Sequence, residues 1–301
     1  GEMSSTSIEN CVGYSNPANH ELDMVFSFHH LKVDYENGEK WSKVPFRFTE
    51  LKGLLNDWAL GMQAGGGWNA LFWNNHDQPR ALNRFGDVER YRAESATMLA
   101  TVIHLLRGTP YVYQGEEIGM TNYPFAGLEE INDIESLNFA HEALEKGQDM
   151  AAIMDSIRMI GRDNARTPMQ WGSTKQAGFS SADKTWLPVN PNYQSINVQA
   201  ALADPDSIFY TYQKLVQLRK DNDWLIDADF ELLETAGKVF AYKRVRDSES
   251  HLVVVNFSNQ EQNFAWSDSF EDILISNTDV AVALNKQKLQ AWDAFCLKLT
   301  D

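Results

Sequence analysis

The stretch FWNNHDQPR, from Phe72 to Arg80, places an amide, an imidazole and a carboxylate directly after an apolar run. The side chains of Asn75, His76 and Asp77 can all hydrogen-bond the hydroxyl groups of a sugar, and the last two can also exchange a proton. A lone aspartate at a strand end is more often a turn or helix-capping residue. The elements around this triplet therefore decide how it is interpreted.

Three apolar runs of similar length provide those elements. They cover residues 24–30, 69–75 and 109–115, and each is apolar nearly throughout, as in strands that are buried on both faces of a parallel sheet. Helical spacing of apolar residues between them, over 49–62 and 89–107, predicts a parallel α/β arrangement. Polar side chains end all three runs, and in βα barrels the carboxyl ends of the strands build the active site.

The rest of the chain predicts a change of architecture. Residues 116–204 show no clear periodicity, and so long a segment usually carries function or a small insertion. An amphipathic helix is predicted over 206–222. Short strand-like runs separated by turn residues follow at 238–245, 251–257 and 294–299. We therefore expect a partial barrel domain over 1–223 and a small antiparallel β domain over 224–301.

Composition excludes several classes of partner. The 301 residues are 43% hydrophobic and 12% aromatic, which supports a packed core, and the net charge is −16. This charge argues against nucleic acid or an anionic membrane surface as the partner. No apolar run is long enough to span a membrane, and GEMSSTSIEN has no signal pattern. The two distant cysteines, Cys11 and Cys296, make no disulfide framework, so a reducing cytoplasm is expected.

Four stretches carry a resemblance to a known family. FWNNHDQPR resembles the end of the seventh barrel strand in the α-amylase superfamily of retaining glycoside hydrolases, and GEMSS resembles the end of the fifth. RDNARTPMQW (162–171) is typical of its α-glucosidase branch, and FHHLKVDYENGEKW (28–41) resembles trehalose-6-phosphate hydrolases. The resemblance implies the C-terminal part of a (β/α)8 barrel, from the end of the fifth strand, followed by a small antiparallel β-sandwich domain.

The resemblance also implies roles for particular residues. Glu2 matches the general acid/base, and Asp77 matches the carboxylate that stabilises the oxocarbenium-like transition state. His76 matches a histidine that binds hydroxyls of the reacting sugar, and Arg166 matches an arginine that shapes the pocket mouth. No cofactor and no metal site is implied.

The family's nucleophilic aspartate has no counterpart in these residues. It lies in a Gly-Phe-Arg-x-Asp type motif, which this sequence lacks. Retaining hydrolysis needs two carboxylates roughly 5 Å apart, and three barrel strands do not close a barrel. We therefore expect the chain alone to be inactive and the missing N-terminal half of the same enzyme to be its partner.

The substrate is predicted from a lysine-containing loop. Lys32, Lys40 and Lys43 follow the first apolar run, although acidic residues lie between them and a solvated mixed-charge loop has the same pattern. The resemblance selects Lys32 and Lys43 as contacts for the phosphate of a phosphorylated disaccharide, trehalose 6-phosphate. The alternatives are an oligo-1,6-glucosidase or dextran glucosidase, and a non-catalytic sugar-binding relative.

Overall fold

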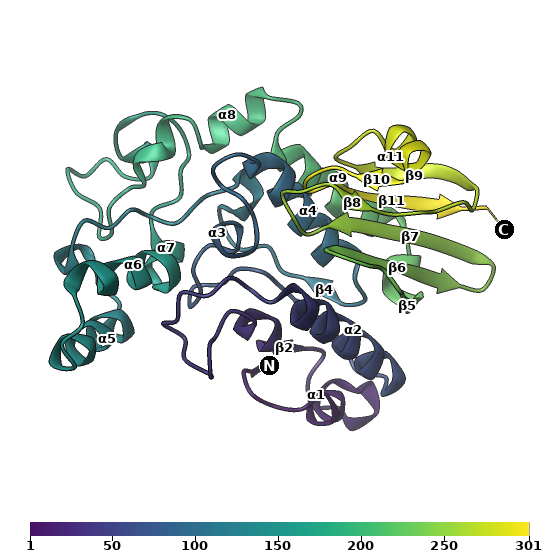
Figure 1. Ribbon diagram of the computed structural model, residues 1–301, viewed down its shortest axis with the longest axis horizontal. Helices are drawn as coiled ribbons and strands as arrows, with labels where there is room; N and C mark the ends of the chain where they lie inside the picture. Colours follow the sequence, from purple (N-terminus) through teal and green to yellow (C-terminus); the bar gives the residue numbers. More distant parts are fainter. Residues whose placement is uncertain (301) are drawn as a thin grey trace.

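The computed structural model describes residues 1–300, so residue 301 of the predicted β domain lies outside the described residues. Figure 1 shows the C-terminal sheet at one end of the long axis and the teal helices α5, α6 and α7 at the other. The N-terminal strands and helices lie between and below them. Among residues 1–300, no helix is both long and apolar enough to cross a membrane.

A parallel sheet forms the first half of the fold, as predicted. Its strands lie in the order β1 (Glu2–Met3), β2 (Val25–Ser27), β3 (Asn69–Leu71) and β4 (Thr109–Pro110). The register places Glu2 opposite Phe26, and Phe26 opposite Ala70. The ladders are shorter than the apolar runs, because the backbone leaves the sheet while side chains such as Phe72 and Trp73 stay buried.

Helices between the strands close the core. The predicted helix over 49–62 is α2 (Phe48–Ala64), and that over 89–107 is the shorter α4 (Arg92–Leu105). Helix α9 (Ile208–Asp221) also matches its prediction and packs against α4. The analysis missed α1 (Ile8–Ser15), whose N-terminus is capped by the Ser7 side chain through the amide of Asn10. A short helix, α3 (Ala81–Phe85), follows the FWNNHDQPR stretch.

The segment over 116–204 is more helical than its sequence pattern suggests. It contains α5 (Ile134–Glu145), α6 (Met150–Ile160), α7 (Asp163–Arg166) and α8 (Val198–Ala203). The Asp133 and Asp149 side chains cap α5 and α6. These two helices pack on each other around a small core, so each buries one apolar face, and the sequence analysis did not recognise this pattern within the long segment.

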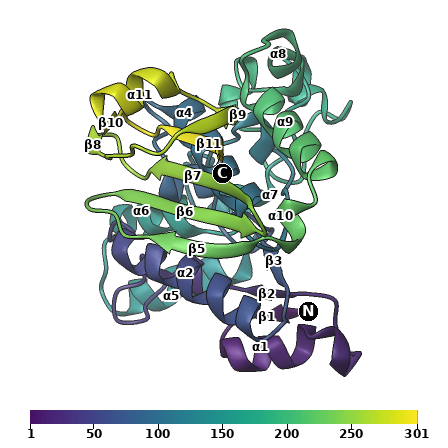
Figure 2. The same ribbon diagram turned by 90° about the vertical axis from the view of Figure 1, so that its right-hand side faces the viewer.

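The C-terminal part is antiparallel, in agreement with the prediction. Its main sheet has the order β5-β6-β7-β11-β9 (Figure 2). The strands of the two C-terminal sheets are β5 (Asp229–Leu233), β6 (Val239–Arg246), β7 (Glu249–Asn256), β8 (Gln262–Asn263), β9 (Phe270–Ser276), β10 (Lys288–Leu289) and β11 (Ala294–Leu299). Strands β8 and β10 form a second, two-stranded sheet, and α10 (Trp224–Asp227) and α11 (Val280–Lys286) flank these strands.

The two halves share one hydrophobic core. Side chains from one face of the main C-terminal sheet, such as Tyr242 and Val253, belong to the same buried cluster as residues of α2 and α4. The buried guanidinium of Arg244 in β6 crosses this boundary and donates to the carbonyl oxygens of Leu105 at 2.9 Å and Ala228 at 2.7 Å. The sheet is therefore fixed against the helices by both apolar packing and hydrogen bonds.

Candidate active site

The loop after β3 presents His76 and Asp77 at the carboxyl end of the parallel sheet. The amide of Asp77 donates to Oδ1 of Asn75 at 2.8 Å, an Asx turn that sets the local direction of the chain. The His76 side chain is 67% exposed and its Nε2 lies 3.5 Å from Oδ2 of Asp77. An imidazole and a carboxylate oxygen thus stand side by side where a sugar hydroxyl can reach both.

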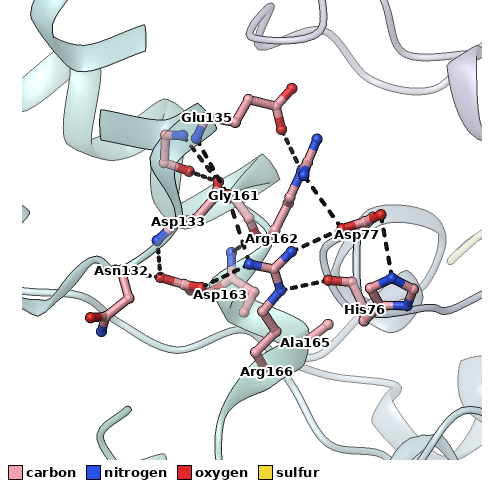
Figure 3. Close-up of polar contacts among 12 residues, drawn as sticks. His76, Asp77, Asn132, Asp133, Glu135, Gly161, Arg162, Asp163, Ala165 and Arg166 are labelled. Carbon is pink, nitrogen blue, oxygen red and sulfur yellow. Dashed lines mark hydrogen bonds and ion pairs between the residues drawn. The ribbon is translucent and has the colours of Figure 1, made fainter. Parts of the chain in front are cut away.

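Arg166 holds this pair in place. Its Nη2 donates to Oδ1 of Asp77 at 2.8 Å, and its Nε donates to the carbonyl oxygen of His76 at 2.7 Å (Figure 3). The other side of the guanidinium faces two further carboxylates, with Nη1 at 3.8 Å from Asp133 and 3.5 Å from Asp163. A guanidinium held among three carboxylates is well fixed, because its planar donors have partners in several directions.

A second arginine reaches Asp77 from the same short helix region. Nη1 of Arg162 lies 3.4 Å from Oδ1 of Asp77, and its Nε lies 2.6 Å from Oε2 of Glu135. The ammonium group of Lys40 contacts the same Glu135 oxygen at 2.5 Å, and burial lowers the pKa of Lys40. Asp77 therefore stands at one end of a chain of alternating charges that runs through Arg162 and Glu135 (Figure 3).

Buried carboxylates set the position of these arginines. Asp163 Oδ2 accepts from the amides of Asn132 and Asp133 at 2.7 and 2.9 Å. The Asp133 side chain in turn accepts from the amide and hydroxyl of Ser136, and Asp133 is thereby the N-cap of α5. The start of α5 and the α7 region are thus joined, and this explains how an inserted helical pair comes to serve the strand-end site.

The structure leaves Glu2 apart from this cluster. It lies on β1, two strands away from β3, and its side chain is exposed. Among residues 1–300, the Glu2 side chain makes no hydrogen bond or ion pair, so it is not joined to His76, Asp77 or Arg166. The role implied for Glu2 stays a prediction.

The two predicted phosphate contacts each have a partner within the chain. Nζ of Lys32 donates to the carbonyl oxygen of Ser4 at 2.8 Å and to Oγ of Ser5 at 3.1 Å, directly after β1. Nζ of Lys43 lies 3.5 Å from Asp155 in α6. Lys32 is therefore next to the segment that carries Glu2, whereas Lys43 lies against the helical insertion. Within residues 1–300, neither lysine forms a hydrogen bond or ion pair with His76, Asp77 or Arg166.

The two histidines beside the lysines have structural contacts. Nε2 of His30 hydrogen-bonds the carbonyl oxygen of Phe72 at 2.8 Å, and burial lowers the pKa of His30 to about 4. The His29 ring contacts the Trp58 ring and its Nδ1 lies 3.0 Å from Oγ of Ser27. His30 therefore stays neutral near pH 7 and joins the segment after β2 to the segment after β3.

Several residues around the site were missed by the sequence analysis. They are Asn74, Arg80, Glu116, Asp133, Glu135, Arg162 and Asp163. Arg80, Arg162 and Asp163 lie within motifs already quoted, and charged residues beside a matched motif could have drawn attention to them. Asn74 lies within FWNNHDQPR and Glu116 directly follows the third apolar run, so the predicted clustering of the strand ends brings the two segments together, but it does not show that these two side chains bond.

Chemically, this arrangement suits sugar recognition and charge stabilisation. The two arginines meet at Oδ1 of Asp77, whereas Oδ2 has His76 as its only ion-pair partner among residues 1–300 and can accept from a ligand hydroxyl. A carboxylate held rigidly in this way can stabilise positive charge that develops on a sugar ring. Within residues 1–300, no three His, Cys, Asp or Glu side chains are grouped so that they could hold a metal ion.

The parallel βα sheet and the arginine-held carboxylate at a strand end agree with the class of glycoside hydrolases built on a (β/α)8 barrel. The family comparison is specific. Residues 1–228 match the model "Alpha amylase, catalytic domain", and residues 239–294 match "Alpha-amylase SusG C-terminal domain". The chain belongs to the α-amylase family of glycoside hydrolases.

Individual relatives indicate which members of this family the chain resembles. The chain is 56% identical over 289 residues to a glucan 1,6-alpha-glucosidase of Streptococcus dysgalactiae subsp. equisimilis, covering 95% of this chain and 54% of the relative. It is 48% identical over 310 residues to a trehalose-6-phosphate hydrolase of Bacillus subtilis, covering 100% and 54%. The crystal structure of Bacillus licheniformis trehalose-6-phosphate hydrolase superposes with a TM-score of 0.94 at 46% identity, covering 100% of this chain and 56% of that one. The chain thus spans about half the length of the relatives it matches.

Proposed function

We propose that this chain provides the acid/base and transition-state-stabilising side of a retaining α-glucosidase. The observation that carries the proposal is the Asp77 carboxylate, held by Arg166 beside His76 at the end of β3. Asp77 and His76 bind the hydroxyls of the reacting glucosyl ring, and Asp77 stabilises its oxocarbenium-like state. Glu2 protonates the glycosidic oxygen and then deprotonates the attacking water.

The bond we favour is an α-1,6 linkage in a glucan or isomalto-oligosaccharide. Identity to glucan 1,6-alpha-glucosidases, at 56%, exceeds that to the trehalose-6-phosphate hydrolases, at 48%. The cations near the site are also engaged within the chain, since Lys40 and Arg162 share Glu135 and Lys43 faces Asp155. An uncharged sugar can bind while each of these cations stays with its carboxylate partner.

A second candidate substrate is trehalose 6-phosphate, which one observation favours. Lys43 is 38% exposed and its partner Asp155 is 58% exposed, with 3.5 Å between the charged atoms. Such a surface pair contributes little, so a phosphate dianion could replace the carboxylate with small loss. Within residues 1–300, Lys32 is bonded only to neutral oxygens, those of Ser4 and Ser5, so its charge is not neutralised by a carboxylate there.

Turnover further requires a nucleophile, which we place outside these residues. The 301-residue sequence has no Gly-Phe-Arg-x-Asp type motif, and retention depends on a carboxylate opposite the acid/base. We therefore propose that the chain alone does not turn over substrate and acts together with the other barrel half. The two buried free thiols, Cys11 and Cys296, support a reducing compartment such as the cytoplasm.

The test compares substrates and one acid/base variant in the full-length protein that contains this chain. We expect hydrolysis of isomaltotriose with retention, and kcat reduced about 10²–10⁴-fold in Glu2→Gln. The matched control is Glu9→Gln, which alters an exposed glutamate seven positions after Glu2 and should leave the rate unchanged. Near-normal turnover by Glu2→Gln would remove the acid/base assignment. A higher kcat/KM for trehalose 6-phosphate than for isomaltotriose would select the second substrate.

A further inference from the structure

The loop that carries His76 and Asp77 is held at both ends by buried polar side chains. At its start, Oδ1 of Asn74 accepts from the amide of Ala81 at 2.7 Å, so one side chain ties together the two ends of the loop. Near its end, Nη1 of Arg80 donates to the carbonyl oxygen of Gln114 at 2.6 Å. The geometry at Asp77 therefore depends on which way the Asn74 amide faces.

Glu116 determines that orientation. It follows β4 in a short 3-10 helix, it is only 7% exposed, and its Oε2 accepts from Nδ2 of Asn74 at 2.5 Å. An acceptor on this side keeps the amide nitrogen toward Glu116 and the oxygen toward Ala81. Glu116 thereby acts on the Asp77 loop without touching it directly.

Tyr212 fixes Glu116 in turn. The hydroxyl of Tyr212, in α9, donates to Oε1 of Glu116 at 3.0 Å, and its ring meets His104 of α4 edge-on. Burial raises the pKa of Glu116 to about 7, against the effect of these two donors. Its two donors, Asn74 and Tyr212, hold the buried carboxyl group in one orientation.

We propose that Glu116 is a positioning residue for Asp77, acting through Asn74 and held by Tyr212. The inference rests on the proposed function, because Asp77 is the group whose placement matters. It extends the site from the exposed strand end to a buried chain of three side chains: Tyr212 of α9, Glu116 of the 3-10 helix after β4 and Asn74 of the loop after β3. Removing any link should loosen the loop and misplace Asp77 relative to the sugar.

Hydrogen exchange of the chain tests the loop directly. The variants are Tyr212→Phe, which keeps the ring, and Glu116→Leu, which removes the acceptor; Glu116→Gln retains one acceptor oxygen and is the conservative rescue. We expect exchange in the peptide spanning residues 74–85 to be about 3- to 10-fold faster in the first two variants, as for loss of one buried hydrogen bond. The exchange rate of this peptide in Glu116→Gln should lie between the rates in these variants and the rate in wild type.

Tyr242→Phe is the matched control. Tyr242 is a fully buried tyrosine in β6, and its hydroxyl has no hydrogen-bond partner within residues 1–300, so removal of the hydroxyl should leave exchange at 74–85 unchanged. If Tyr212→Phe exchanges like wild type in this peptide, Glu116 and Tyr212 do not hold the loop and the inference is wrong. Equally fast exchange of the peptide 74–85 in Tyr242→Phe would also overturn the inference, because it would indicate that the whole structure had loosened.

Kinetics of the full-length protein supply the second readout. We expect Tyr212→Phe and Glu116→Leu to lower kcat about 10-fold or more. The ratio of kcat between substrates with different aglycones should change little, because the misplaced group is the reacting glucosyl ring that Asp77 binds. Faster loop exchange with unchanged kcat would contradict a positioning role. If wild type hydrolyses no α-glucoside, the proposed function fails, and the exchange result alone then decides whether Glu116 holds the loop.

Discussion

One guanidinium joins His76 and Asp77: Arg166 donates to Oδ1 of Asp77 and to the backbone carbonyl of His76, at 2.8 and 2.7 Å. Side chain and main chain of the same loop are therefore fixed by one group. The two contacts use different nitrogens of a rigid plane, which a lysine ammonium does not reproduce.

Arg166→Lys should consequently lower kcat/KM even though the charge is kept. We expect a loss of about 10- to 100-fold in the full-length protein, equal to one or two charge-assisted hydrogen bonds. Arg246→Lys, in a paired arginine of the C-terminal sheet, is the control and should have near wild-type kinetics. A wild-type kcat/KM in Arg166→Lys would show that charge alone suffices at this position.

The lysines distinguish the two candidate substrates. With an α-1,6 glucan as the substrate, Lys32→Ala and Lys43→Ala should change kcat/KM by less than about 3-fold, since surface pairs are weak. With trehalose 6-phosphate as the substrate, kcat/KM of the same variants should fall about 10- to 150-fold, whereas kcat/KM for an uncharged aryl α-glucoside should not change.

Lys175→Ala is the matched control for both substrates, because its ion pair with Asp183 is exposed and lies in another loop. Equal losses on charged and uncharged substrates in Lys32→Ala would indicate that Lys32 serves the loop after β1 through Ser4 and Ser5.

The sequence predicted the longer helices α2, α4 and α9 and missed the shorter ones. Helix α2 was found within two residues at each end, because its apolar residues recur at helical spacing on one face. Helices α5 and α6 were missed although each buries one apolar face: they are short, they lie within a long segment between other elements, and their starts are set by the Asp133 and Asp149 caps.

The candidate site was predictable only where a motif carried it. His76, Asp77 and Arg166 come together in the structure, although 89 positions separate Asp77 from Arg166. The contacts of Glu135 with Arg162 and of Glu116 with Asn74 join segments whose meeting depends on the tertiary fold. Local periodicity contains no information about such pairs.

The raised pKa of Glu116 predicts a pH dependence of stability. Its folded value is about 7, above the ordinary 4.5, so the folded state retains a proton that the unfolded state has lost between these values. The free energy of unfolding should therefore fall as pH rises from 4.5 to 7 and level off above that. For Glu116→Gln this contribution is absent.

Urea denaturation of this chain at pH 5 and pH 8 measures the difference. The stability of wild type relative to Glu116→Gln should decrease by about 2–3 kcal/mol between the two pH values. Subtracting the variant removes the opposite trends of His30 and His104, whose pKa values are lowered to about 4 by burial. A difference that is constant with pH would mean that Glu116 titrates at its ordinary value.

The last prediction concerns the attachment of the C-terminal sheet. Arg244 is fully buried and donates to four carbonyl oxygens, those of Leu105, Trp224, Leu225 and Ala228. Burial lowers its pKa to about 10, so the group is still charged at neutral pH. Arg244→Met keeps much of the volume but leaves these carbonyls without their donor in a buried place.

We expect Arg244→Met to lower the free energy of unfolding by about 3–5 kcal/mol, as when a partner of a buried charged network is lost. Arg246→Met, two positions along the same strand, removes exposed ion pairs with Asp227 and Glu249 and should cost less than about 1 kcal/mol. Thermal and urea denaturation of the two variants give the comparison. Similar small losses in both would show that apolar packing alone holds the sheet, since the carbonyls at the end of α4 and around α10 would then find water or other donors without penalty.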